Sequence, residues 1–210
     1  MKGLLLKDWY ILFKTYKIYL VIIVGLGAIS AFLTVDAFTI LIPVLCAVLI
    51  YNLMTSDEQS GWITYSETMP YSRRDAVLGK YVVLIIMEIG AAIVVGASRV
   101  VKMLIESSFD IRIVILLAVC VFFAGIISGG LMLPFMFRYG TQKGKLVYFV
   151  FVGLAVMGIS MAANSLNIVT VATKILSHTC LLAATLLIAS LVLYSLSLLI
   201  SIKLFQTRVL

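Results

Sequence analysis

Long apolar runs constrain this chain more than any other feature of its sequence. A transmembrane helix needs about 20 mostly apolar residues to cross a hydrocarbon layer roughly 30 Å thick. Six runs approach or exceed that length, at residues 18–35, 37–54, 81–98, 113–137, 146–163 and 180–202. Only 12% of the residues are charged, against about a quarter in a soluble domain. The sequence therefore predicts a polytopic membrane protein.

The runs indicate helices rather than barrel strands. Backbone polar groups must be hydrogen-bonded within lipid, and barrel strands alternate apolar and polar residues, which these runs do not. The predicted fold class is all-α, with six transmembrane helices. Only Asp36 separates the first two runs, so they form either a tight helical hairpin or one very long helix. Asp36 and the polar Thr34 favour the hairpin.

Lysine and arginine are distributed unequally between the two sides of the predicted membrane domain. Six spans place both termini on one side, and the side richer in Lys and Arg is cytoplasmic. Twelve of these residues lie on the side of the termini: Lys2, Lys7, Lys14, Lys17, Arg73, Arg74, Lys80, Arg138, Lys143, Lys145, Lys203 and Arg208. Four lie opposite: Arg99, Lys102, Arg112 and Lys174. Both termini are therefore predicted to be cytoplasmic, and the net charge of +7 reflects topology and anionic lipid rather than nucleic acid.

The first segment, residues 1–17, has an amphipathic pattern. One stripe at helical spacing carries apolar and aromatic side chains: Leu5, Trp9, Leu12 and Tyr16. The charged residues Lys7, Asp8 and Lys14 fall on other faces. This pattern predicts a helix lying in the membrane interface, with its Trp and Tyr at the depth of the headgroups. The alternative is a crooked beginning to the first span. The predicted division is an interfacial helix at 1–17 and a transmembrane domain at 18–210.

A polar block, residues 57–75, interrupts the apolar sequence between the second and third runs. The segment 56–59, Ser-Asp-Glu-Gln, fits a capping box and predicts the start of a short helix. Pro70 disfavours helical geometry at Met69. The segment 72–75, Ser-Arg-Arg-Asp, predicts a second N-cap that leads into the third span. Trp62, Tyr65 and Tyr71 give the block the composition of a docking surface, although a solvated loop with interfacial aromatics fits the same residues.

The block also carries a family resemblance. Asp57-Glu58 is followed by Trp62, Met69-Pro70, Arg73-Arg74 and then by residues 79–81, Gly-Lys-Tyr, entering a span. This order resembles the six-span permeases of type-2 ATP-binding-cassette (ABC) exporters. It is most similar to the branch with the phenol-soluble modulin exporter permeases and related bacterial peptide or antibiotic exporters. Met69 stands where family members more often have Leu.

The resemblance implies a pore subunit in the bacterial cytoplasmic membrane. Two such chains, alike or paired with a sister permease, would dimerise on two ATPase subunits. Residues 56–80 would act as the coupling loop, with these residues docked in a groove of the ATPase: Asp57, Glu58, Trp62, Arg73 and Arg74. The implied substrates are amphipathic peptides or antimicrobial compounds. The chain has no GxxxxGK[ST] motif, because the glycine and lysine spacing within 140–146 is wrong. ATP and magnesium are therefore expected in a partner chain.

Glu88 is the notable polar residue inside a predicted span. A carboxyl group there is costly and marks a functional site by default. It could line or gate a pathway, form a structural hydrogen bond between helices, or be protonated. Gly125 and Gly129 form a GxxxG pattern in the fourth span, which favours close helix packing within one subunit over a subunit interface.

The sequence predicts no catalytic site and no metal site. His178 has no companion histidine, and the three cysteines lie in predicted spans without a CxxC pair. Three functions remain open: an ATP-driven export permease, a proton-coupled secondary transporter using Glu88, and a non-transporting immunity or sensory subunit. A secondary transporter favours internal repeats, and the last three spans contain no counterpart of Glu88.

Overall fold

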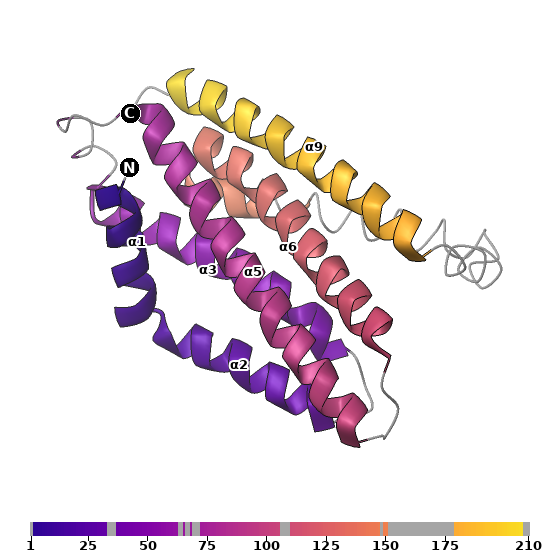
Figure 1. The fold of residues 1–210 in the computed structure, drawn as a ribbon. Helices are drawn as coiled ribbons and strands as arrows, with labels where there is room; N and C mark the ends of the chain where they lie inside the picture. The colour runs from indigo at the N-terminus through magenta and orange to yellow at the C-terminus, as the bar shows by residue number, and fades with distance from the viewer. Residues whose placement is uncertain are drawn as a thin grey trace.

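The computed structural model describes residues 2–32, 37–62, 65, 68, 72–105, 110–147, 149–150 and 179–207. Its named elements are all helices: α1 (Lys2–Lys14), α2 (Lys17–Phe32), α3 (Ala37–Gln59), α5 (Arg73–Ile105), α6 (Ile111–Tyr139) and α9 (Thr179–Thr207) (Figure 1). No strand occurs among the described residues. The predicted all-α fold class is confirmed.

Four described helices contain a stretch long and apolar enough to cross a membrane. These stretches are Leu41–Gln59, Arg73–Ile105, Ile111–Tyr139 and Ile188–Phe205. Helices α1 and α2 qualify only as a pair, bent by 69° at the break between them, which would give a fifth, broken span. The predicted run at 146–163 lies almost entirely outside the described residues. The membrane class of the chain is thus confirmed at the level of four or five candidate spans.

The helices pack as a bundle in which α2, α3, α5 and α6 alternate in direction along the chain, whereas α9 runs parallel to α6 (Figure 1). α6 contacts α9, α5 and α3, while α2 packs on both α3 and α5. Because α2 and α3 are separate helices in mutual contact, the predicted hairpin is confirmed over one long helix. Both chain ends lie at the same end of the bundle (Figure 1). α3 ends and α5 begins at this end as well, so we refer to this end as the connection end and to residues 60–72 as the α3–α5 connection.

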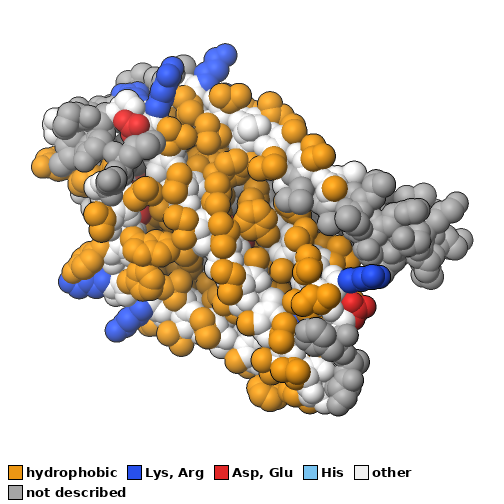
Figure 2. Space-filling model, in the orientation of Figure 1, with side chains coloured by type: hydrophobic (Ala, Val, Ile, Leu, Met, Phe, Trp, Pro, Cys, Tyr) orange, Lys and Arg blue, Asp and Glu red, His pale blue; other side chains and the backbone are white. Residues whose placement is uncertain are grey.

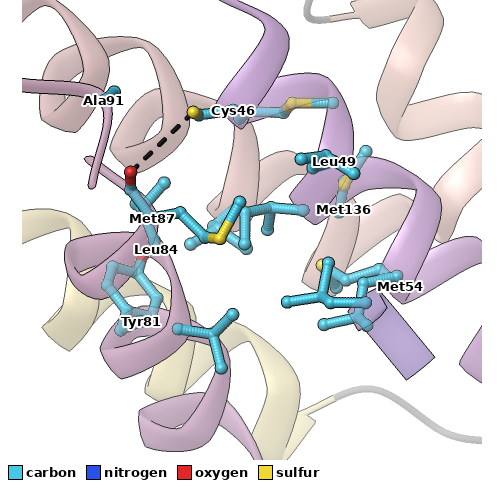
Figure 3. Close-up of a cluster of buried hydrophobic side chains, with 14 of the residues drawn as sticks. Cys46, Leu49, Met54, Tyr81, Leu84, Met87, Ala91 and Met136 are labelled. Carbon is cyan, nitrogen blue, oxygen red and sulfur yellow. Dashed lines mark hydrogen bonds between the residues drawn. The ribbon is translucent and has the colours of Figure 1, made fainter. Parts of the chain in front are cut away.

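Apolar side chains form both the core and the outer surface. Leu49 of α3, Leu84 of α5 and Met136 of α6 belong to one buried cluster in the interior (Figure 3). Leu53 of α3 is buried in the same cluster. The Cys46 thiol faces the carbonyl oxygen of Met87 at 3.9 Å. Figure 2 shows apolar side chains over most of the visible face, with Lys and Arg near its margins. A soluble monomer rarely exposes so large an apolar area, so this surface suits lipid.

Local sequence signals explain where α5 and α6 begin. The Ser72 hydroxyl accepts a hydrogen bond from the Asp75 amide at 3.2 Å, and the Asp75 carboxylate accepts one from the Ser72 amide, also at 3.2 Å. This reciprocal pair confirms the predicted N-cap of α5. α6 begins after Asp110, whose carboxylate accepts from the Arg112 amide at 3.0 Å. It ends at Tyr139, and the following Gly140 caps it with a φ of 80°, which suits glycine.

The predicted helix start at residues 56–59 is wrong. α3 continues through Ser56 and ends at Gln59, and the chain then turns at Gly61, which has a φ of 67°. Ser56 therefore lies in the last turns of a helix instead of capping a new one. The capping-box pattern is local, whereas long-range contacts of Asp57 and Glu58 hold this end of α3 in place.

Candidate functional site

Four charged side chains form a closed ring at the connection end. Lys7 and Asp8 come from α1, Asp57 from α3 and Lys80 from α5. Lys7 Nζ lies 2.5 Å from Asp57 Oδ1 and 3.3 Å from Asp8 Oδ1. Lys80 Nζ lies 2.8 Å from Asp8 Oδ1 and 2.6 Å from Asp57 Oδ2. The charges alternate around this charge ring, so each ammonium group contacts two carboxylates and each carboxylate contacts two ammonium groups.

The charge ring is largely closed to solvent. Asp8, Asp57 and Lys80 are 2%, 5% and 8% exposed. Removing charges from water costs several kcal/mol per ion, by order of magnitude, unless opposite charges and hydrogen bonds compensate. The alternating ring supplies that compensation. The family resemblance implied that Asp57 docks in an ATPase groove, but its side chain points into its own chain and joins α3 to α1 and α5.

Trp62 extends the charge ring into the α3–α5 connection. Lys7 Nζ lies 4.4 Å from the centre of the Trp62 ring, within cation–π range. The Trp62 and Tyr65 rings are 5.7 Å apart. Lys7 therefore touches α3 through Asp57 and the connection through Trp62 at the same time.

Glu58 ties the end of α3 to the segment that follows α6. Its carboxylate accepts a hydrogen bond from the Thr141 amide at 2.7 Å and another from the Thr141 hydroxyl. Residues 141–147 are helical, so the carboxylate lies at the start of a helix, where free amides favour negative charge. The next turn packs tightly, because a Cβ added at Gly144 would come within 2.9 Å of the Met136 α-carbon.

The two arginines of the polar block have different surroundings. Arg73 Nη1 donates to the Phe205 carbonyl oxygen at 3.3 Å, and its guanidinium lies 5.9 Å from the Phe205 ring centre. Phe205 in turn packs on Phe137 with ring centres 5.2 Å apart. Arg73 thus links the start of α5 to the end of α9, whereas the Arg74 side chain is exposed.

These contacts surround one cavity at the connection end. It has a volume of about 50 Å³, and its lining includes the whole charge ring together with Trp62, Thr141 and Phe205. A buried water needs roughly 10–15 Å³ of such volume, so the cavity could hold a few waters but no sizeable ligand. The site is thus a junction between helix ends and not a substrate chamber.

The kind of protein that contains this junction follows from its similarity to a known family. A family model described as ABC-2 family transporter protein matches residues 3–206. The chain belongs to the ABC-2 transporter family. A search of curated proteins found no match. ABC-2 permeases are the membrane components of ABC transporters and generally work with ABC ATPase subunits.

Glu88 lies in the interior of this ABC-2 protein. Its side chain is 0% exposed, and neither carboxyl oxygen has a hydrogen-bond partner among the described residues. The carboxyl group occupies the space that a Cβ at Gly125 would need, and Leu84, one turn earlier, occupies the same space at Gly129. The two glycines of α6 therefore receive two side chains of α5 within one chain.

The four side chains of the predicted stripe do not all face the same way, and Tyr16 lies beyond the end of α1. Leu12 is buried and the Tyr16 hydroxyl donates to the Asn52 carbonyl oxygen at 3.0 Å, while Leu5 is half-buried and Trp9 is 37% exposed. The buried line of the helix runs through Leu4, Asp8 and Leu12. Asp8, expected on another face, turns inward because Lys80 neutralises it.

Sequence reasoning missed several residues of the site. Lys7, Asp8 and Lys80 had no predicted site role, although a buried acid in α1 needs a basic partner elsewhere. The Tyr81 hydroxyl, fully buried, lies 2.7 Å from both the Ser197 and Ser201 hydroxyls of α9. The available signal was the Gly-Lys-Tyr segment at 79–81, which the family resemblance singled out without a role for its side chains.

Proposed function

We propose that this chain is the permease subunit of an ATP-driven exporter and that the α3–α5 connection couples it to separate ATPase subunits. The observation that carries the proposal is the charge ring, which fastens both ends of this connection to each other and to α1. A connection that transmits force from an external motor must be rigidly joined to the helices it moves. The charge ring provides such a joint in a chain that belongs to the ABC-2 family.

The proposed topology has six spans with α1 in the membrane interface. The spans are α2, α3, α5, α6, the run at 146–163 and α9. Both termini and the α3–α5 connection face the cytoplasm of a bacterial cell. The excess of Lys and Arg on the side of the termini supports this orientation. The 33 residues of α5, about 50 Å of helix, are longer than a membrane is thick, so one end can reach the cytoplasm.

The proposed docking surface divides the five predicted coupling residues into two groups. Trp62 and the exposed Arg74 are accessible to an ATPase groove. Asp57, Glu58 and Arg73 act from inside, because their side chains fasten the connection to α1, Thr141 and Phe205. ATP and magnesium bind in the ATPase subunits.

The proposed transport pathway forms between two permease chains, either identical or sister subunits. Amphipathic peptides or antimicrobial compounds are its proposed substrates, in line with the resemblance of the polar block to peptide exporters. Glu88 is the proposed gating residue. Its carboxyl oxygens have no hydrogen-bond partner among the described residues, so no hydrogen bond from Glu88 to those residues secures α5 to α6 at this level.

Affinity purification of the tagged chain from its native membrane tests the proposal. An ABC ATPase should co-purify, identified by mass spectrometry and by ATP hydrolysis. Absence of any ABC ATPase under conditions that keep the permease folded would overturn the proposed function.

The docking surface is tested separately by substitution. The paired variant Trp62→Ala/Arg74→Ala should release the ATPase. The control is the paired variant Trp9→Ala/Lys14→Ala, which removes an aromatic and a basic side chain from α1 and should retain the ATPase. An ATPase retained by the first pair would refute the docking role.

A further inference from the structure

The charge ring joins three helices that are far apart in the sequence. Lys7 and Asp57 are separated by 50 positions and Asp8 and Lys80 by 72. Asp57 and Lys80 also contact each other directly, so the two ends of the α3–α5 connection would stay paired without α1. Two of the four ring residues therefore serve to bring α1 into a joint that α3 and α5 could form alone.

Helix α1 is also connected to the first long helix. Only residues 15 and 16 lie between α1 and α2, and the two helices meet at 69°. Backbone hydrogen bonds hold this bend in place. The Tyr16 amide donates to the Ile11 and Leu12 carbonyl oxygens at 3.3 and 3.2 Å. A displacement of α1 is therefore passed to α2, which packs on α5 and α3.

We propose that Lys7 and Asp8 are positioning residues that make α1 move together with the α3–α5 connection. The proposal rests on the proposed function, because it assumes that ATPase subunits move this connection. Withdrawing α1 alone would break the Lys7–Asp57 and Asp8–Lys80 contacts and the stacking of Lys7 on Trp62. Separating paired charges in a poorly hydrated place is unfavourable, so the joint moves as one body. The motor thus acts on α2 through α1 as well as on α3 and α5 directly.

Hydrogen exchange of the permease–ATPase complex tests this inference without knowledge of the substrate. Exchange is followed by mass spectrometry in peptides covering α1 and in peptides covering the α3–α5 connection, with and without Mg·ATP and vanadate. In the native chain both regions should change on trapping with nucleotide. In Lys7→Met/Asp8→Asn, which keeps the Asp57–Lys80 pair, the connection should still change and the response of α1 should be lost. Lys14→Met, which removes an α1 lysine outside the charge ring, should respond as the native chain does.

The possible results separate this inference from the proposed function. A native complex in which neither region responds to nucleotide contradicts the coupling role of the connection. A native connection that responds while α1 does not contradicts the inference alone, as does an α1 response that survives in Lys7→Met/Asp8→Asn. If that double variant does not fold, Asp8→Asn replaces it, because it retains Lys7 on Asp57 and Trp62. The α1 response should then decrease, and an unchanged response would overturn the inference.

Discussion

The Glu88 carboxyl group of α5 fills the space beside the α-carbon of Gly125 in α6 that a methyl group would require. The lack of a side chain at Gly125 thus makes room for the Glu88 carboxyl group, in addition to allowing two backbones to approach closely. Leu84 and Gly129 repeat the arrangement one turn away. A GxxxG pattern usually indicates a helix–helix interface. Here two buried side chains of the same chain, Glu88 and Leu84, pack against its two glycines.

Gly125→Ala should destabilise the permease because the added methyl group displaces a fully buried carboxyl group. Overpacking of this kind costs about 1–3 kcal/mol. Thermal unfolding in detergent, followed by fluorescence-detected size exclusion, measures the loss. Gly96→Ala is the control, since its Cβ would meet only the Ala118 Cβ at 3.9 Å. Glu88→Ala should relieve the effect when combined with Gly125→Ala, and additive losses would contradict the packing argument.

Glu88→Gln should leave the fold intact and alter transport. The carboxyl oxygens have no hydrogen-bond partner among the described residues, so the amide has none to lose there, and polar contacts in membranes average only about 0.6 kcal/mol. The readout is uptake of a fluorescent amphipathic peptide by proteoliposomes holding the permease–ATPase complex. Cys120→Ala serves as a control inside α6. Peptide uptake at the native rate by Glu88→Gln would remove Glu88 from the gating proposal.

Tyr81→Phe tests the polar contact between α5 and α9. The phenol oxygen lies 2.7 Å from two serine hydroxyls, Ser197 and Ser201, and its loss should cost about 0.6–1.7 kcal/mol. Tyr139→Phe removes the hydroxyl of a 43% exposed tyrosine and should have no such cost. Equal unfolding temperatures for Tyr81→Phe and the native chain would show that the three hydroxyls contribute nothing to stability.

Glu58→Ala should loosen the segment after α6. The substitution removes the acceptor for the Thr141 amide and hydroxyl, and hydrogen bonds to a charged group are worth about 1.5–3 kcal/mol. Trypsin should therefore cleave after Lys143 or Lys145 about 10- to 100-fold faster, if cleavage follows the opened population. Gln59→Ala changes the neighbouring exposed side chain and should leave the cleavage rate as it is. Unchanged cleavage in Glu58→Ala would mean that this contact does not hold the segment.

Patterns within single segments predicted much of this fold. The lengths of the apolar runs predicted where the described spans lie. The Ser72–Asp75 pattern predicted the start of α5, because a helix cap depends on residues that are close in the sequence. The same local rule failed at Ser56. There α3 continues, and the residues that hold its end, Lys7 and Lys80, are distant in the sequence.

The candidate site was predictable only in part for the same reason. The polar block directed attention to the connection beside which the charge ring lies, yet it could not show that Asp57 faces inward. Helical spacing alone placed Asp8 away from the core, because periodicity treats a charge as a surface residue. A paired charge reverses that expectation, and the pair becomes visible only when α1 and α5 are brought together.

The balance of charge in the ring leads to the sharpest stability prediction. Lys80→Met leaves Asp8 and Asp57 to share Lys7, and breaking a buried pair by removing one partner costs about 3–5 kcal/mol. Adding Asp8→Asn restores neutrality and retains the Lys7–Asp57 contact. Removing both partners of a buried pair is often close to neutral, so the double variant should be more stable than Lys80→Met despite its second substitution. Lys143→Met, at an exposed position, controls for the loss of a lysine, and chemical denaturation in detergent ranks all three. A double variant no more stable than Lys80→Met would show that charge balance does not govern this joint.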